Sequence, residues 1–200
     1  MFTGIIDHCG EIVRMDQQPD RLQLCIQTMF TDLELGESIA VDGVCLTITK
    51  IEPTVFYCDV SPETLRLTTI GGYKVNQCVN LERALLPSTR MGGHFVTGHI
   101  DQQGTIATIR QVGEFEEWEI AGLTPQTKPY VIQKGSIAVN GVSLTVNSTN
   151  GNSFCIMLIP HTLQGTNLSK LHEGFQVNLE FDMMARIIVE QTRAYLPPHP

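Results

Sequence analysis

The chain has no long hydrophobic run and no cluster of basic residues. Its longest apolar stretches are only a few residues, far short of the roughly 20 that a membrane-spanning helix needs. The formal net charge is -8, and the Lys and Arg residues are scattered, which argues against a nucleic-acid backbone as partner. We therefore expect neither a membrane protein nor a nucleic-acid-binding protein.

The sequence also lacks closely spaced cysteine pairs and the pattern of a secretory signal peptide at its N-terminus. The six cysteines lie singly, without a Cys-x-x-Cys pair, so neither a zinc site nor a dense disulfide framework is indicated. The start, Met1-Phe2-Thr3-Gly4, does not place a basic segment before an apolar one. These absences predict a cytoplasmic protein with free thiols and no metal site.

What the chain does contain is an internal duplication. Residues 41–47 (VDGVCLT) recur at 139–145 (VNGVSLT), an offset of 98, with five of the seven positions identical. Residues 79–82 (VNLE) recur at 177–180 at the same offset. Thr3-Gly4 recurs as Thr97-Gly98 at an offset of 94, so the second copy has four extra residues, which we expect in a loop.

A repeat of this length has the size of a complete small domain rather than of a solenoid unit. We predict two similar domains, 1–94 and 95–182, followed by a segment, 183–200. One interpretation is that duplication only built a larger stable protein. The other is that the two copies present two related pockets, for a reaction that uses two similar molecules.

Short alternating segments dominate both halves, for example residues 22–26, 38–41 and 54–60. Alternation at period two is typical of strands with one buried face, and turn residues such as Asp42-Gly43 and Asn140-Gly141 punctuate them. Closing each sheet removes its exposed edges. We predict an all-β fold, a tandem of two six-stranded antiparallel Greek-key barrels.

Only the end of the chain has a strong helical pattern. Asp182 is a good N-cap, the helix is predicted to run to about Leu196, and Pro197-Pro198 is expected to end it. Five residues share one stripe: Met184, Ile187, Ile188, Gln191 and Tyr195. The stripe either packs on its own barrel or forms an oligomer contact between identical helices.

The connection between the halves, residues 91–101, is rich in glycine and histidine. Glycine allows a ligand to approach the backbone closely, and histidine exchanges protons near neutral pH. His99 stands where the first copy has Ile5, an asymmetry that favours a functional role over a structural one. A metal site of His94, His99 and a cysteine is disfavoured, because in a regular strand their odd separation points them to opposite faces.

Cys45 and Ser143 occupy equivalent places in the duplicated phrase. Each is predicted to share a strand face with the threonine two residues later, and such pairs suit the polar edge of a heterocycle. The alternative is that Cys45 is a small buried apolar residue, the common situation of a free cysteine.

Together these motifs resemble riboflavin synthases of the type made of two homologous barrels, over essentially the whole chain. The residues that carry the resemblance are Met1-Phe2-Thr3-Gly4-Ile5-Ile6, the phrases 43–47 and 141–145, residues 92–99, Glu63-Thr64-Leu65, Pro160-His161-Thr162-Leu163, and the repeats 79–82 and 177–180. The resemblance implies dismutation of two molecules of 6,7-dimethyl-8-ribityllumazine into riboflavin and 5-amino-6-ribitylaminouracil, the last step of riboflavin biosynthesis. It implies no cofactor, a homotrimer formed through the C-terminal helix, and leaves open an association with lumazine synthase.

The family pattern also implies two substrate pockets. The first takes Cys45, Leu46, Thr47, Asp59, Val60, Ser61, Pro62, Glu63, Thr64, Gly98, His99 and Ile100. The second takes Gly4, Ile5, Ile6, Lys134, Ser143, Leu144, Thr145, Met157, Leu158, Ile159, Pro160, His161 and Thr162. His161 stands where the first copy has Glu63 and is expected to orient the ribityl chain differently.

For proton handling we predict His99 and Ser143, acting across a subunit interface. Cys45, for ring contact or nucleophilic assistance, and His94, for holding the glycine-rich segment, are secondary candidates. Relatives in luminous bacteria that bind a lumazine or flavin without turnover provide the competing prediction. Because both halves keep a threonine and a Cys or Ser at the equivalent places, the sequence favours the enzyme.

Overall fold

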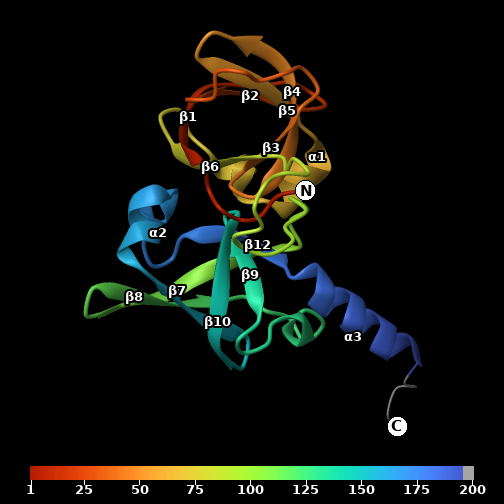
Figure 1. The fold of residues 1–200 in the computed structure, drawn as a ribbon, viewed down its shortest axis with the longest axis vertical. Coiled ribbons are helices and arrows are strands. Elements are labelled where there is room, and N and C mark those ends of the chain that lie inside the picture. The colour runs from red at the N-terminus through yellow and green to blue at the C-terminus, as the bar shows by residue number, and fades with distance from the viewer. Residues whose placement is uncertain (196–200) are drawn as a thin grey trace.

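The computed structural model describes residues 1–195, which form two closed six-stranded antiparallel barrels followed by a helix (Figure 1). The first barrel contains β1 (His8–Gln17), β2 (Leu22–Gln27), β3 (Ser38–Val41), β4 (Val44–Glu52), β5 (Val55–Val60) and β6 (Cys78–Arg83). The second contains β7 (Gln102–Val112), β8 (Phe115–Ala121), β9 (Ser136–Val139), β10 (Val142–Asn150), β11 (Ser153–Leu158) and β12 (Gln176–Phe181). The predicted fold class is confirmed.

Both barrels follow the same strand order, β1-β2-β5-β4-β3-β6 in the first and its equivalent in the second. Short helices connect the strands: α1 (Pro62–Leu67) and η1 (Thr69–Gly72) in the first barrel, and η2 (Lys128–Tyr130), α2 (Pro160–Gly165) and η3 (Asn167–Lys170) in the second. The connection from β2 to β3 spans residues 28–37, and that from β8 to β9 spans 122–135. The four extra residues therefore lie in the loop that carries η2, as expected.

Each barrel has its own core, built from the inward residues of the alternating strands. Ile12, Leu24 and Phe56 are fully buried in the first barrel, and Trp118 and Phe154 in the second. Fully burying one large apolar side chain contributes roughly 1.5–3 kcal/mol. Two separate cores fit the prediction that a complete domain was duplicated.

The duplicated phrases meet where the two barrels touch. Asp42-Gly43 and Asn140-Gly141 form the β3–β4 and β9–β10 turns, and Gly43 and Gly141 have φ of +81° and +79°. A Cβ on either glycine would lie 2.7 Å from the backbone nitrogen of the other. The two turns are thus packed directly against each other, and only glycine fits both the left-handed backbone and the close approach.

A buried carboxylate makes this contact asymmetric. Asp42 accepts hydrogen bonds from the Tyr73 hydroxyl at 2.6 Å, the Asn80 amide nitrogen at 2.7 Å and the Asn167 side chain at 2.9 Å. Burial raises the pKa of Asp42 to about 7, against the lowering effect of these three donors. The equivalent residue of the second barrel is the neutral Asn140, which accepts from the Asn178 amide at 2.8 Å.

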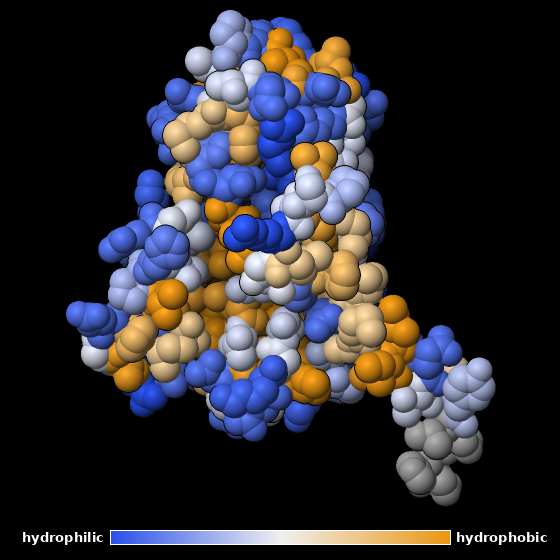
Figure 2. All heavy atoms as spheres, viewed as in Figure 1, coloured by the Kyte–Doolittle hydropathy of each residue, from blue (hydrophilic) through white to orange (hydrophobic). Residues whose placement is uncertain are grey.

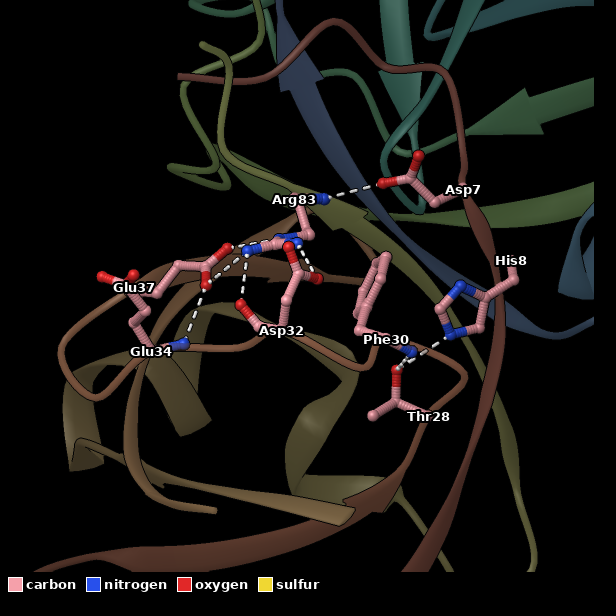
Figure 3. Close-up of polar contacts among 8 residues, drawn as sticks. All are labelled: Asp7, His8, Thr28, Phe30, Asp32, Glu34, Glu37 and Arg83. Atoms are coloured by element: carbon pink, nitrogen blue, oxygen red, sulfur yellow. Dashed lines mark hydrogen bonds and ion pairs between the residues drawn. The ribbon is translucent and has the colours of Figure 1, made fainter. Parts of the chain in front are cut away.

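An ion-pair network anchors the entry to the first barrel (Figure 3). The Asp7 carboxylate accepts from the Arg83 backbone amide at 2.9 Å, and the Arg83 guanidinium pairs with Glu37 at 2.6 Å and Asp32 at 2.7 Å. In the second barrel, Asp101 accepts from the amide of Phe181 at 2.8 Å. The pairs Ile6-Asp7 and Ile100-Asp101, which occupy equivalent places in the two copies, thus tie each incoming segment to the last strand of a barrel.

The final helix, α3 (Met183–Tyr195), begins at Asp182, whose side chain accepts from the Met184 amide at 2.9 Å. The predicted N-cap is therefore confirmed, whereas the predicted end near Leu196 and Pro197-Pro198 lies outside the described residues. None of the helices within residues 1–195 is long and apolar enough to cross a membrane.

Helix α3 contacts its own barrel through its polar side. Arg186 pairs with Asp101 at 3.0 Å, and Arg193 donates to the Gln126 carbonyl at 2.8 Å. The apolar stripe is not covered: Met184, Ile187, Ile188 and Tyr195 are 54%, 50%, 61% and 81% exposed. Hydrophobic surface is visible where the helix leaves the second barrel (Figure 2). The interpretation in which the stripe packs on its own barrel does not hold.

Candidate functional site

The segment that starts the second barrel crosses to the first. The Cys45 amide donates to the Gly98 carbonyl at 2.9 Å, and Ile100 packs against the core of the first barrel. Cys45 is half-buried on the outward face of β4, between the inward Val44 and Leu46. Gly98 has φ of +83°, and a Cβ there would overlap Cys45.

The segment that starts the first barrel makes the reciprocal crossing. The Ser143 amide donates to the Gly4 carbonyl at 2.8 Å, and Ile6 packs against the core of the second barrel. Between the crossings, Phe2 and Val96 form an antiparallel bridge with mutual bonds of 2.7 and 3.1 Å. Each candidate pocket therefore combines a strand of one barrel with the entry segment of the other.

Two buried glutamates hold the crossing segments in place. Glu82 accepts from the Thr3 amide at 2.6 Å, the Thr3 hydroxyl at 2.7 Å and the Gly4 amide at 3.0 Å. Glu180 accepts in the same way from Thr97, at 2.6 Å twice, and from Gly98 at 2.9 Å. Burial raises the pKa of both carboxyls, and their hydrogen bonds oppose this.

Sequence reasoning missed the role of these glutamates. Both the Thr-Gly pairs and the VNLE phrases had been recognised as repeats. The repeated glutamate of the VNLE phrase, which lies among buried apolar residues, was the one signal that could have indicated a structural role. Nothing in the sequence near either glutamate indicates that it binds a Thr-Gly pair about 80 residues away.

The linker places an imidazole on the second pocket. His94 Nδ1 lies 2.7 Å from the Ser143 hydroxyl, and the His94 amide donates to the Thr3 carbonyl at 3.1 Å. Burial lowers the pKa of His94, with a smaller opposing effect of the Asp182 carboxylate. Among residues 1–195, no group hydrogen-bonds the buried His94 Nε2. A mainly neutral imidazole next to a hydroxyl can accept the proton of that hydroxyl.

The two linker histidines lie in different surroundings, and the action of His99 and Ser143 across a subunit interface stays a prediction. Residues 91–101 do not form a regular strand, apart from the bridge at Val96. Within the described chain, Ser143 is paired with His94 and not with His99, which is exposed beside Gly98 on the first pocket. The ring of His94 contacts Ser143, while only its backbone holds the segment. Sequence spacing could not reveal this, since Ser143 reaches the linker through tertiary contacts alone.

The other predicted residues of the first pocket lie on the surface around β5 and α1. Asp59 accepts from Gln23 at 2.9 Å, and Ser61 caps α1, accepting from the Thr64 amide at 3.2 Å. Pro62 occupies the first turn, and Glu63 pairs with Arg66 at 2.7 Å. Thr47 is exposed two residues beyond Cys45 on the same face.

In the second pocket, Thr145 is exposed and Met157 is half-buried, while Ile159, Pro160, His161 and Thr162 form the start of α2. Ile159 replaces the capping serine of the first copy, so α2 has no side-chain cap. Ile5 is 51% exposed. Lys134, with φ of +67°, donates its amide to the Val146 carbonyl at 2.8 Å, next to Thr145.

Four predicted residues point inward instead. Leu46, Val60 and Leu158 are buried in the barrel cores, and Leu144 packs against the second core. Strand alternation requires this, because Cys45 and Ser143 face outward. Leu46, Val60 and Leu158 can therefore meet a ligand only through their backbone, whereas part of the half-buried Leu144 side chain is accessible. Within residues 1–195, no three His, Cys, Asp or Glu side chains are arranged to hold a metal ion.

The close approach at Gly98 gives a stability prediction. Gly98→Ala combines a left-handed backbone with a clash against Cys45, so we expect a loss of about 2–4 kcal/mol in the free energy of unfolding. Gly36→Ala is the matched control, since its φ is +84° but nothing lies within 4 Å of its Cβ position. Urea unfolding of both variants measures the difference. Equal losses would contradict the proposed tight contact.

The comparisons with known proteins agree with this architecture. The lumazine binding domain family matches residues 3–84 and 97–182. Riboflavin synthase of Actinobacillus pleuropneumoniae is 43% identical over 190 residues, covering 94% of this chain and 88% of that protein. Riboflavin synthase of Photobacterium leiognathi is 39% identical over 191 residues, covering 94% and 87%.

Solved structures also match. A crystal structure of LumP complexed with 6,7-dimethyl-8-(1'-D-ribityl)lumazine has a TM-score of 0.81 and 25% identity, covering 90% of this chain and 99% of that one. LumP complexed with riboflavin has a TM-score of 0.84 at the same identity and coverage. Two barrels with exchanged entry segments therefore define a tandem lumazine-binding-domain architecture. The chain belongs to the riboflavin synthase family, and the resemblance inferred from its sequence is confirmed.

Proposed function

We propose that this protein is a riboflavin synthase, a cofactor-independent transferase that converts two molecules of 6,7-dimethyl-8-ribityllumazine into riboflavin and 5-amino-6-ribitylaminouracil. The observation that carries the proposal is a pair of equivalent contacts between barrels, Cys45 with Gly98 and Ser143 with Gly4, made by the same positions of the two copies. A reaction whose donor and acceptor are the same compound needs two similar pockets. The name of the curated relatives supports the same activity.

Orientation is the main contribution expected of the two pockets. Holding two heterocycles face to face replaces an encounter between dilute molecules with a local reaction, which contributes roughly 7–11 kcal/mol in favourable cases. The exposed Thr47 and Thr145 lie at equivalent places on the outward faces of β4 and β10. They are suited to hydrogen-bond the polar edge of each ring system.

The pockets differ in their proton-transfer groups. In the second pocket, His94 is positioned to take the proton of Ser143, leaving an alkoxide-like oxygen that can activate a ring or a water molecule. In the first, Cys45 occupies the equivalent place, and His99 lies beside it. We propose that Ser143 and His94 act together, and that His99 faces them across a subunit interface when two pockets meet.

The test is incubation of the purified protein with 6,7-dimethyl-8-ribityllumazine alone, with chelator present, followed by chromatography of both products. Riboflavin and the ribitylaminouracil in equal amounts are expected. Tight fluorescent binding without product would overturn the proposal and indicate a carrier or antenna, the alternative raised by the likeness to the LumP complexes.

Trimerisation is the second part of the proposal. The uncovered stripe of α3 needs an apolar partner, and a second copy of the same stripe provides one. Association through α3 would bring the first barrel of one subunit to the second barrel of a neighbour. A cytoplasmic location and an association with lumazine synthase stay predictions.

Introducing negatively charged side chains into the apolar stripe of α3 is expected to dissociate the trimer. The double variant Ile187→Glu with Ile188→Glu should have the mass of a monomer by light scattering and lose most of its turnover, because the two pockets of one reaction then no longer meet. Met29→Glu is the control, as Met29 is 71% exposed on the first barrel and far from α3 in sequence. An unchanged mass for the stripe variant would contradict this assembly.

A further inference from the structure

A pair of cysteines lies on the outer face of the first barrel. Cys9 is on β1 and Cys78 on β6, and the register pairs Cys9 with Asn80 and Glu11 with Cys78. Residues opposite or two apart in an antiparallel ladder share one face, so the two thiols are diagonal neighbours. Both are free and half-buried.

The internal repeat shows that the fold does not require cysteine here. At the equivalent places, Gln103 pairs with Asn178 and Thr105 with Gln176, so the second barrel carries two glutamines instead of two cysteines. Gln103 has a structural contact, because its amide donates to the Thr68 carbonyl at 2.9 Å. The cysteine pair is thus a local difference between two otherwise matched surfaces.

The thiols share a hollow of about 350 Å³ with Lys170, which comes from η3 of the second barrel. Cys9 Sγ lies 3.7 Å from Asn80 Oδ1 and 3.9 Å from the Gly165 carbonyl, and both of these are acceptors. Acceptors disfavour a thiolate at Cys9, so Cys9 keeps its proton. Cys78 is the member of the pair that is free to ionise.

Two groups around the hollow favour the thiolate form of Cys78. The pKa of the Cys78 thiol is lowered to about 7, first by the neighbouring Cys9 thiol and then by the Lys170 ammonium, against burial and the carboxylates of Asp42 and Glu11. The pKa of Cys9 is raised, first by its hydrogen bond to Cys78 and then by burial. A thiolate that is partly accessible and lies beside a cation is the usual setting of a reactive cysteine.

We propose that Cys78 is a modification site for low-molecular-weight disulfides, with Cys9 and Lys170 as the groups that stabilise its thiolate. The Cys78 sulfur attacks one sulfur of the disulfide RS–SR, a new S–S bond forms, the old one breaks, and RS⁻ leaves and takes a proton from water. Diagonal neighbours across an antiparallel ladder lie about 7–8 Å apart, and their Cβ atoms somewhat less, whereas the Cβ atoms of a disulfide are about 3.8 Å apart. We therefore expect the mixed disulfide of Cys78 to persist until an external thiol reduces it.

The experiment follows the reaction of the whole protein with 5,5'-dithiobis(2-nitrobenzoate) by absorbance, and locates the adduct by peptide mass spectrometry. We expect Cys78 to react first, at least about 10-fold faster at pH 7 than any other cysteine, with a rate midpoint near pH 7. Equal labelling of Cys9, Cys45 and Cys155 would overturn the proposal.

Two variants test the role of the neighbour. Cys9→Ala removes the S–H donor and is expected to slow the reaction at pH 7 by about 10-fold or more and to raise its pH midpoint, whereas Cys9→Ser keeps a donor and should preserve both. Cys78→Gln, the residue type found in the second barrel, should abolish the fast phase and leave the fold unchanged by circular dichroism. An unaltered rate and midpoint in Cys9→Ala would contradict the assigned role of Cys9.

Discussion

His94→Gln is expected to lower kcat for 6,7-dimethyl-8-ribityllumazine by about 100-fold to 10,000-fold, the usual contribution of a general base. Glutamine keeps a hydrogen bond to Ser143, which lies 2.7 Å from the imidazole, but it cannot accept a proton at neutral pH. The loss should therefore appear in kcat with little change in KM. Steady-state formation of riboflavin measures both.

His99→Gln is the matched comparison, because the two histidines lie in the same linker and differ in their surroundings. His99 is exposed and follows Gly98, whose carbonyl contacts Cys45, so its replacement should cost about 10-fold in kcat/KM through a lost contact to the ligand. Because burial lowers the pKa of His94, the rate of the unchanged enzyme should fall only at a pH below the ordinary histidine range. A His94→Gln variant with unchanged kcat would exclude His94 as the base.

Asp42→Asn is expected to remove a large pH dependence from the stability of the protein. The folded-state pKa of Asp42, about 7, lies above its ordinary value of 3.8, so the folded protein binds this proton more tightly than the unfolded chain does. The resulting stabilisation is fully present below about pH 4 and is lost as the pH rises through 7. The difference between the folded-state pKa and the ordinary pKa of Asp42 corresponds to a change of about 4 kcal/mol in the free energy of unfolding.

The measurement is urea unfolding of both proteins between pH 4 and pH 8. We subtract the unfolding free energy of the Asp42→Asn variant from that of the unchanged protein at each pH. This difference should fall by several kcal/mol between pH 4 and pH 8, because asparagine does not titrate. Asparagine still accepts the hydrogen bonds from Asn80 and Asn167. Subtracting the variant cancels the other titrating groups. Asp20→Asn, at an exposed aspartate, is the control and should show no such change. A flat difference for Asp42→Asn would mean that the carboxylate is not buried in solution.

Much of the fold was predictable because it rests on local patterns. Period-two alternation identified the strands, Asp42-Gly43 and Asn140-Gly141 identified two turns, and Asp182 identified the start of the helix. The match between the copies located the extra residues of the second barrel in a loop. Hydrophobic periodicity and turn chemistry act over a few residues, so they can be read from the chain directly.

The candidate site was only partly predictable. Family resemblance selected Cys45, Ser143 and the crossing segments, and the structure brings Gly98 to the first and Gly4 to the second. The pairing of His94 with Ser143 was not foreseen. It joins residues 49 positions apart through the bridge between Phe2 and Val96, a contact without a local sequence signature.

By itself, the sequence determined that this protein is duplicated, all-β and helical at its end, because repetition and periodicity are properties of the linear chain. Only the tertiary structure decided that Glu82 and Glu180 hold the crossing entry segments, that His94 pairs with Ser143, and that Asp42 is buried where the two turns meet. These features depend on which surfaces come into contact once both barrels have closed. That packing sets the burial and the hydrogen-bond partners of each side chain. Burial and hydrogen bonding in turn set the pKa of each group that can take part in catalysis.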